Sequence, residues 1–166
     1  MIQEKSKSTK SIWLGRIMRY GPLLLWFSLI FYASTDHLSN ENTSKVVYPF
    51  IKWLFFSPSE ATIEILHIII RKIAHFTEYA VLAFFLARAT TSSTKDWLNK
   101  NWFKWSISII VLYALLDEYH QSFESTRMAS IYDSLIDISG GLTVLCFFYW
   151  KIKQKALIKE RLLQAN

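Results

Sequence analysis

The chain is poor in the residues and motifs that mark several common functional classes. It has a single cysteine, Cys146, so the sequence excludes a disulfide framework and a CxxC metal or redox motif. Cys146 stands inside an apolar run, where packing is its expected role. The sequence also contains no GxSxG elbow, no P-loop and no HExxH pair. It therefore gives no support to nucleophilic hydrolysis. Because it shows neither repeats nor a domain boundary, we predict one domain over residues 1–166.

Apolar residues are what the chain has in abundance. They make up 52% of the sequence, aromatic residues make up 16%, and the mean hydropathy is +0.19, which is high for a soluble protein with 19% charged residues. Several tryptophans stand at the ends of apolar runs, as membrane-interface aromatics do. A soluble protein with an aromatic core is the less favoured alternative. The net charge of +6 lies in blocks between the runs rather than on one polar face, which argues against a nucleic-acid partner.

Four apolar runs are long enough, or nearly so, to cross a bilayer as helices. They cover residues 20–35, 71–87, 105–121 and 131–150, and the second could begin earlier than Arg71. The first has about 16 residues against the ~20 that a bilayer requires. Pro58 and Ser59 before Glu60 predict a helix start, and with it an interfacial lead-in to the second run. The sequence thus predicts an all-α polytopic membrane protein with a bundle of about four transmembrane helices.

Basic residues predict how these helices are oriented. The N-terminal tail (1–19), the 88–104 loop and the C-terminal tail (151–166) carry five, four and five Lys or Arg, whereas the remaining segments together carry five. Cytoplasmic segments are enriched in Lys and Arg, so both termini are expected in the cytoplasm and the membrane core is expected over about 20–150. The first run would then be an uncleaved anchor. The polar ends of the other three runs are expected on the extracytoplasmic side.

Ionisable side chains gather at those three polar ends, although each costs roughly 2.5 to 3.5 kcal/mol at the centre of a membrane helix. In the second run Arg71, His75, Glu78 and Tyr79 share one helical face, and Lys72 stands beside them. The third run ends in Asp117, Glu118, His120 and Gln121. In the fourth, Asp133 and Asp137 lie one turn apart and lead to Gly140 and Gly141, a small-residue face that permits close helix contact. The alternative interpretation is structural, with interface cations and polar ties between helices.

Three motifs in this order resemble the VanZ-like family of small bacterial integral membrane proteins, named for a protein associated with teicoplanin resistance. They are RKIAHFTEYAVLA at 71–83, LLDEYHQSF at 115–123, and Arg127 with the series Asp133, Asp137, Gly140 and Gly141. The segment FYASTDHLS at 31–39 is similar to the family's Ser-containing exit from its first helix. The resemblance implies a role for the polar residues of these motifs, and Arg71 is added to them. The candidate ligand-binding residues are then Arg71, Lys72, His75, Glu78, Tyr79, Asp117, Glu118, His120, Gln121, Arg127, Asp133 and Asp137.

The resemblance and the charges leave three functions open. The first is a factor in the bacterial cytoplasmic membrane that binds an anionic lipid, a peptidoglycan precursor or a glycopeptide antibiotic, and so contributes to teicoplanin-type resistance. The second is an enzyme acting on a lipid-linked substrate, with His75, Glu78, Asp117, Glu118 and His120 as the candidate catalytic residues. Arg127 would hold an anion, and Asp133 and Asp137 would orient partners or a metal. The third is a scaffold or partner subunit, and any of the three could be oligomeric. The cofactor is unknown, since the donors would suit a divalent metal but no motif spacing supports one.

Overall fold

The described part of the chain contains helices and no strands. The computed structural model describes residues 9–56, 58–123 and 130–164. Its elements are α1 (Thr9–Ala33), the 3₁₀ helix η1 (Asp36–Leu38), α2 (Asn40–Leu54), α3 (Glu60–Thr91), α4 (Asp96–Lys100), α5 (Trp102–Gln121) and α6 (Ile131–Gln164). The all-α prediction is confirmed. Of the candidate site residues, Arg127 lies outside the described residues.

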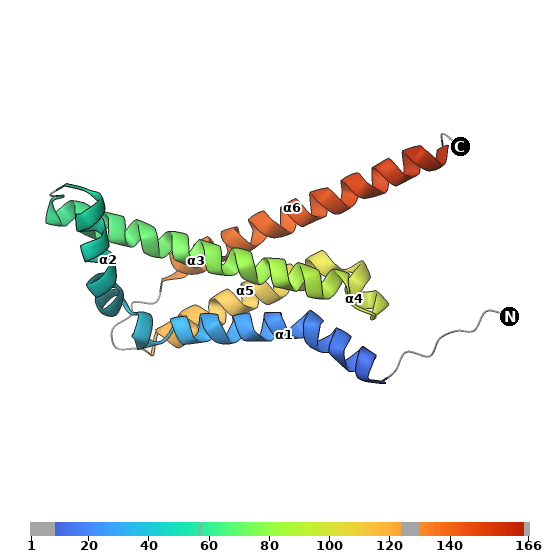
Figure 1. The fold of residues 1–166 in the computed structure, drawn as a ribbon, viewed down its shortest axis with the longest axis horizontal. Coiled ribbons are helices and arrows are strands. Elements are labelled where there is room, and N and C mark those ends of the chain that lie inside the picture. The colour runs from blue at the N-terminus through green and yellow to red at the C-terminus, as the bar shows by residue number, and fades with distance from the viewer. Residues whose placement is uncertain (1–8, 57, 124–129, 165–166) are drawn as a thin grey trace.

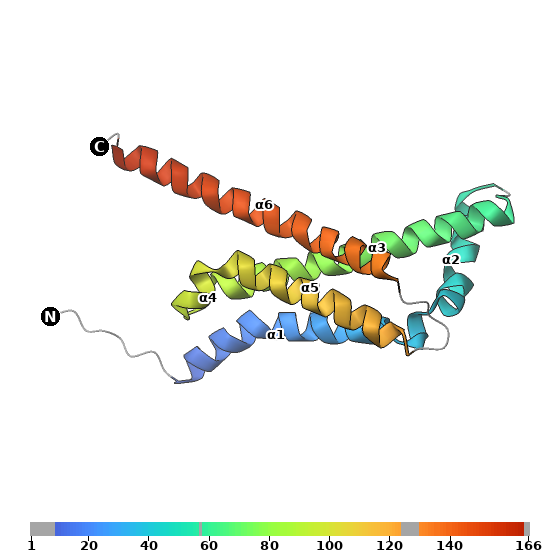
Figure 2. The ribbon, with the colours of Figure 1, turned by 180° about the vertical axis from the view of Figure 1, so that it is seen from behind.

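Helix α3 is the centre of the bundle, because it contacts α1, α2, α4, α5 and α6. The start of α1, the short α4 and the end of α6 lie toward one end of the molecule, at the right in Figure 1. The end of α5 and the start of α6 lie toward the opposite side, close to η1, and α2 with the start of α3 extends beyond them, as the view from behind in Figure 2 also shows. The polar segments of three separate runs are thereby brought to one end, which we call the polar end.

Serine caps set the starts of α2 and α3. The side chain of Ser59 accepts a hydrogen bond from the backbone N–H of Thr62 at 3.2 Å, so the helix start expected at Glu60 is confirmed. The expected lead-in and the second apolar run form one continuous helix of 32 residues. Ser39 caps α2 in the same way, through the N–H of Asn42. Helix α2 was not expected in the 36–62 loop, because its first half is polar and no membrane-length apolar run marks it.

Both terminal helices extend beyond the apolar runs that predicted them. Helix α1 already begins at Thr9, inside the expected basic tail, and α6 continues past Trp150 to Gln164. All residues of α6 after Trp150 are exposed, and this part of the helix projects away from the bundle in Figure 1. No proline interrupts α6, and nothing in its last segment opposes helix formation. The basic C-terminal tail is therefore largely helical.

Glycines allow α6 to approach its neighbours closely. A Cβ atom at Gly140 would lie 2.1 Å from the backbone oxygen of Phe76 on α3, and one at Gly141 would lie 2.9 Å from the side chain of Ile110 on α5. At Gly140 no larger residue fits without moving a helix, whereas at Gly141 the Ile110 side chain would have to shift. The expected small-residue face is thus a real contact surface. It presses the first turns of α6 against α3 and α5, next to the polar end.

Large apolar side chains cover much of the outer surface. Leu24, Leu25, Ile69, Ile73, Leu112, Leu115, Leu135 and Phe147 are all exposed. Cys146 is exposed as well, so its expected packing role inside the bundle is wrong. Among the described helices, α6 alone is long and apolar enough by itself to cross a membrane, and α1 with η1 and α2, bent by 69°, would count as a second span. The bundle of four spans stays a prediction.

Candidate functional site

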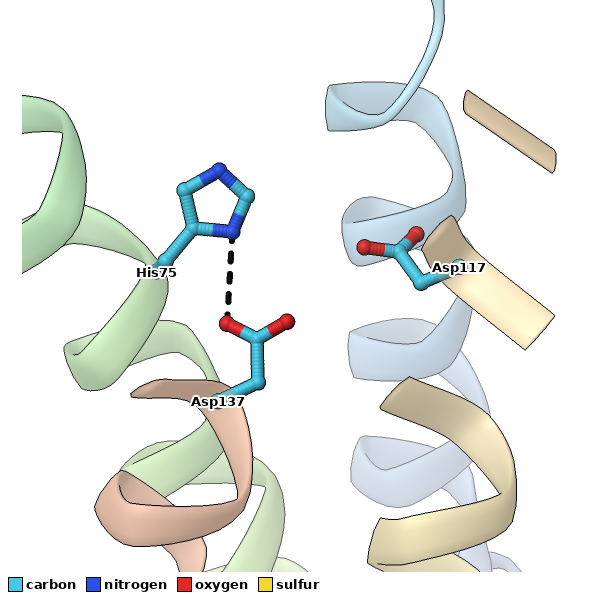
Figure 3. A group of neighbouring side chains, drawn as sticks. All are labelled: His75, Asp117 and Asp137. Carbon is cyan, nitrogen blue, oxygen red and sulfur yellow. Dashed lines mark ion pairs between the residues drawn. The ribbon is translucent and has the colours of Figure 1, made fainter. Parts of the chain in front are cut away.

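Three side chains from three helices meet in the interior of the polar end. His75 of α3, Asp117 of α5 and Asp137 of α6 each offer one potential ligand atom, and these atoms lie within 4.8 Å of one another. Figure 3 shows His75 and Asp137 side by side, with the Asp117 carboxylate facing them. Asp137 is fully buried at 0% exposure, and Asp117 is 6% exposed. We call these three residues the acid–histidine triad.

The contact between His75 and Asp137 joins the two helices that pack most closely. His75 Nδ1 lies 3.3 Å from Asp137 Oδ1. Neither carboxylate oxygen of Asp137 has a hydrogen-bond partner among the described residues. Gly140, one turn further along α6, makes the close contact with Phe76 that holds this part of α6 against His75. Asp137 is therefore placed by helix packing rather than by a hydrogen-bond network.

Asp117 is held by donors on both of its oxygens. The Ser34 hydroxyl at the end of α1 donates to Oδ1, and the Gln121 side-chain amide donates to Oδ2 at 3.0 Å. Gln121 was among the candidate residues, whereas Ser34 was not. The signal that could have found Ser34 is its place in FYASTDHLS, the segment already noted for its resemblance to the family. Ser34 connects the first helix to the triad.

Tyr79 lies one turn beyond His75 on α3 and is fully buried. Its hydroxyl has no hydrogen-bond partner among the described residues. The neighbouring Tyr113 of α5 differs, because its hydroxyl donates to the backbone oxygen of Phe27 at 2.7 Å and ties α5 to α1. A second tie to α1 is the bond from Trp26 Nε1 to the backbone oxygen of Glu78 at 2.9 Å. The walls of the polar end are thus formed by α1, α3, α5 and α6.

Two other candidates on α5 have contacts outside the triad. Glu118 is buried, and its Oε2 accepts a hydrogen bond at 2.6 Å from the backbone N–H of Ser130, directly before α6. A carboxylate at this place is stabilised by the positive end of the helix dipole. His120 lies with its ring 4.7 Å from that of Phe31 on α1, measured between centroids. Glu118 and His120 surround the site, but the structure does not bring them into the triad.

The basic candidates make contacts nearer the surface. Lys72 pairs with Asp133 at 2.7 Å, with both side chains partly exposed. Arg71 Nη1 donates to the backbone oxygen of Leu38 and to the Thr43 hydroxyl, both at 3.4 Å. These contacts tie α3 to α6 on one side and to η1 and α2 on the other.

His67 has a structural contact that its sequence position did not reveal. It is 1% exposed, its Nε2 lies 3.1 Å from the Thr43 hydroxyl, and its ring meets Tyr48 edge-on. In the sequence His67 lies outside the polar clusters. Helix α2, which the sequence did not reveal, folds over it and buries it.

A small pocket of about 100 Å³ opens beside the triad. It is lined by Ala33, Ser34, Leu38, Thr43, Arg71, Ala74, His75 and Glu78. At about 30 Å³ for each water molecule, this volume holds roughly three waters. Pockets that enclose drug-sized ligands start at roughly 300 Å³. The pocket therefore suits an ion, waters or part of a headgroup, and a whole glycopeptide or lipid does not fit inside it.

Comparison with known proteins gives one match. A sequence model of the VanZ/LLP1 family matches residues 20–153, which is most of the chain and includes all three members of the triad. No curated protein and no solved structure matches the chain.

Proposed function

Because the chain belongs to the VanZ/LLP1 family, we propose that it is a multi-pass protein of the bacterial cytoplasmic membrane that binds a phosphate-bearing headgroup at its polar end. The headgroup belongs to an anionic lipid or to a lipid-linked cell-wall precursor. Teicoplanin-type glycopeptides act on such precursors outside the membrane. By binding this headgroup, the protein would therefore contribute to resistance against these antibiotics.

The membrane placement is supported by a charge distribution opposite to that of a water-soluble bundle. Asp137 is 0% exposed, while Ile73 and Leu112 on the outer faces of α3 and α5 are 59% and 60% exposed. Water-soluble proteins bury aliphatic side chains and expose carboxylates, and they rarely present extended apolar surfaces to water. A lipid environment removes the penalty for the apolar exterior and directs charged groups into the bundle.

The proposed spans are the apolar parts of four helices. They are residues 20–33 of α1, 71–87 of α3, 105–121 of α5 and 131–150 of α6. Helices α3 and α5 contain the charged residues of the polar end, which lowers their apolar character. The basic residues of the 88–104 segment and of α6 after Trp150 lie toward the end opposite the triad. By the positive-inside rule that end is cytoplasmic and the polar end faces outward.

The observation that carries the headgroup proposal is the pocket, in which Arg71 and His75 stand together. Both described hydrogen bonds of Arg71 are long, and both come from Nη1, so its guanidinium keeps donor capacity for an anionic oxygen. The pocket volume matches a headgroup fragment rather than a whole lipid. The acyl chains would remain in the bilayer, against the apolar outer faces.

A matched pair of arginine variants tests this proposal. Arg71→Gln removes the pocket cation, whereas Arg88→Gln makes the same change at an exposed position near the other end of α3. We expect Arg71→Gln to weaken binding of short-chain phosphatidylglycerol by about tenfold, the equivalent of one lost charge-assisted hydrogen bond, and to abolish any teicoplanin protection. Arg88→Gln should retain both. Equal lipid affinity of the two variants would contradict the proposal.

Two further variants test the proposal in cells. His75→Ala and Arg127→Ala are each expected to abolish any protection without lowering the amount of protein in the membrane. Immunoblotting of membrane fractions measures that amount beside the drug susceptibility. Unchanged susceptibility in cells whose parent protein protects them would count against the proposed site.

The close contact of His75 with Asp137 favours an enzyme as the second candidate. A carboxylate 3.3 Å from an imidazole orients it and stabilises its charged form, which is the arrangement of many general bases. Such a pair beside a pocket could act on a lipid-linked substrate. Mass spectrometry of lipid extracts from cells with and without the gene tests this, and identical lipid profiles would count strongly against it.

The contacts that cross between helices favour a scaffold as the remaining alternative. The hydrogen bonds from Ser34 to Asp117 and from the Ser130 N–H to Glu118, together with the pair of Lys72 and Asp133, join four helices. The charge-conserving change Asp137→Glu separates the two cases. A scaffold should lose protein from the membrane, whereas a binding site should lose protection at a normal protein level.

A further inference from the structure

The starting observation is a carboxylate that the fold buries without hydrogen-bond donors. Asp137 is 0% exposed, and both of its oxygens are without a hydrogen-bond partner among the described residues. Its one ion-pair contact in the described part of the chain is His75 Nδ1, which makes no hydrogen bond to those residues either. Buried polar groups in proteins are nearly always hydrogen-bonded, and an isolated buried charge is far more costly than an isolated dipole. The unsatisfied oxygens indicate a ligand.

We propose that the acid–histidine triad is a binding site for a divalent transition-metal ion. One nitrogen of His75 and one carboxylate oxygen each of Asp117 and Asp137 would be its protein ligands. A dication balances two carboxylates when the imidazole is neutral, so the site becomes electrically neutral in the interior of the bundle. This inference does not depend on the headgroup proposal, because metal content can be measured whether or not any lipid binds.

The distance within the pair of His75 and Asp137 fits this coordination. Ligand atoms at 2.0–2.2 Å from a tetrahedral metal are separated by roughly 3.3–3.6 Å. His75 Nδ1 and Asp137 Oδ1 are 3.3 Å apart, so a metal can bridge them without movement. The oxygen that Asp117 offers lies within 4.8 Å of the ligand atoms of the other two residues, so binding would draw Asp117 closer to the pair. In Figure 3 the Asp117 carboxylate already faces the pair from across the site.

Residues around the triad provide the support that metal ligands usually have. Ser34 and Gln121 donate to the two oxygens of Asp117, and such outer contacts orient a ligating carboxylate while lone pairs remain for the metal. The packing of Gly140 against Phe76 fixes α6, which carries Asp137. The adjoining pocket shares His75 with the triad, so it offers an access route and room for water at open coordination positions.

The donor set narrows the identity of the metal. Imidazole nitrogen favours zinc, copper, iron and nickel, whereas carboxylate oxygens favour magnesium, calcium and manganese. One nitrogen with two carboxylates lies between these groups, and Zn²⁺ and Mn²⁺ accept such mixed sets. Three protein ligands are also the number found at metal sites that keep a position open for water or substrate. Zn²⁺ and Mn²⁺ are therefore the probes to use.

The test uses the full-length protein in detergent micelles, stripped with a chelator and then titrated with ZnCl₂ or MnCl₂. We expect about one ion for each chain after gel filtration, measured by elemental mass spectrometry. At saturation the thermal unfolding midpoint should rise by roughly 5 °C or more, since the ion binds the folded state. Asp137→Asn should lose at least about 100-fold in metal affinity, because loss of a ligand should exceed the 10–100-fold effect of losing an outer-shell contact.

The matched control is Asp133→Asn, which makes the same change one turn earlier on α6, outside the triad. It should keep the ion with nearly wild-type affinity. If Asp137→Asn does not fold, the stoichiometry and the midpoint shift of the wild-type protein decide the question. Neither metal retained by the wild type, or equal retention by Asp137→Asn and Asp133→Asn, overturns the proposal. In the second case the bound metal belongs to another place on the protein.

Discussion

At the polar end of the bundle, α3, α5 and α6 meet through charged and polar side chains, whereas toward the opposite end they meet through aliphatic ones. His75 and Asp137 represent the first kind of contact. Leu86, Ile110 and Leu145, all nearly or fully buried, represent the second. The same three helices thus form both regions, and the change occurs along α6 at its paired glycines.

The difference indicates that the two regions have different roles. Close aliphatic packing stabilises a helix bundle even where the surroundings are as apolar as leucine, through van der Waals contact. A buried ion pair, by contrast, often contributes little net stability, because the desolvation of both groups offsets their attraction. Charged groups kept at that cost are expected at functional sites. We therefore expect the apolar region to determine stability and the polar end to determine activity.

The largest effect on stability is expected at the boundary between the two regions. Gly140→Ala places a Cβ atom 2.1 Å from the Phe76 backbone oxygen, so α6 must move away from α3. We expect a loss of about 3 kcal/mol in the free energy of unfolding, at the upper end of overpacking effects. Thermal unfolding in micelles measures it. Gly15→Ala is the control, because a Cβ at Gly15 meets nothing within 4 Å. Equal stability of the two variants would show that the close contact is not needed.

A cavity in the apolar region should have the next largest effect. Leu86 is 1% exposed, and Leu86→Ala should lower the free energy of unfolding by about 2 to 3 kcal/mol, the lower part of the range for buried leucines. Leu24→Ala, at a position 64% exposed on α1, should change it by less than about 0.5 kcal/mol. Chemical denaturation of both variants provides the measurement. A smaller loss for Leu86→Ala than for Leu24→Ala would contradict the stabilising role assigned to the apolar region.

Removing both His75 and Asp137 from the polar end should raise stability, in contrast to the two changes above. The double variant His75→Leu with Asp137→Leu replaces a buried ion pair by apolar groups. We expect the chelator-treated protein to become more stable by about 1 to 2 kcal/mol, while any teicoplanin protection is lost. Unfolding midpoints and drug susceptibility are measured on the same variant. A marked loss of stability would indicate that the pair is structural and would remove the contrast between the two regions.

The smallest effect is expected for the exposed pair of Lys72 with Asp133. The two side chains are 45% and 29% exposed, and ion pairs of this kind contribute up to about 1 kcal/mol. Lys72→Gln should therefore lower stability by less than that amount, and less still at high salt. Comparing its unfolding at low and high salt checks this. A loss above about 1 kcal/mol that does not depend on salt would show that this pair at the polar end stabilises the fold.

Much of the helical fold could be read from the sequence, because apolar runs and caps are local signals. The start of α3 at Glu60 and the ends of α3 and α5 lie within a few residues of expectation. Helix α2 was missed, since its polar first half gives no membrane-length run. With α2 unknown, the burial of His67 could not be foreseen, because a residue's exposure depends on what folds over it.

The sequence by itself determined the four helices that contain long apolar runs, which end of each run carries charge, and where α6 has no side chains to keep a neighbour away. It therefore placed His75, Asp117 and Asp137 in a larger set of candidates but could not separate them from Glu118, His120 or Lys72. Only the tertiary structure decided that these three side chains meet and that the others contact a helix terminus, an aromatic ring or the surface. The physical reason is that helical periodicity fixes the face on which a residue lies, whereas the rotation and register of one helix against another follow from close packing, here at Gly140 and Gly141.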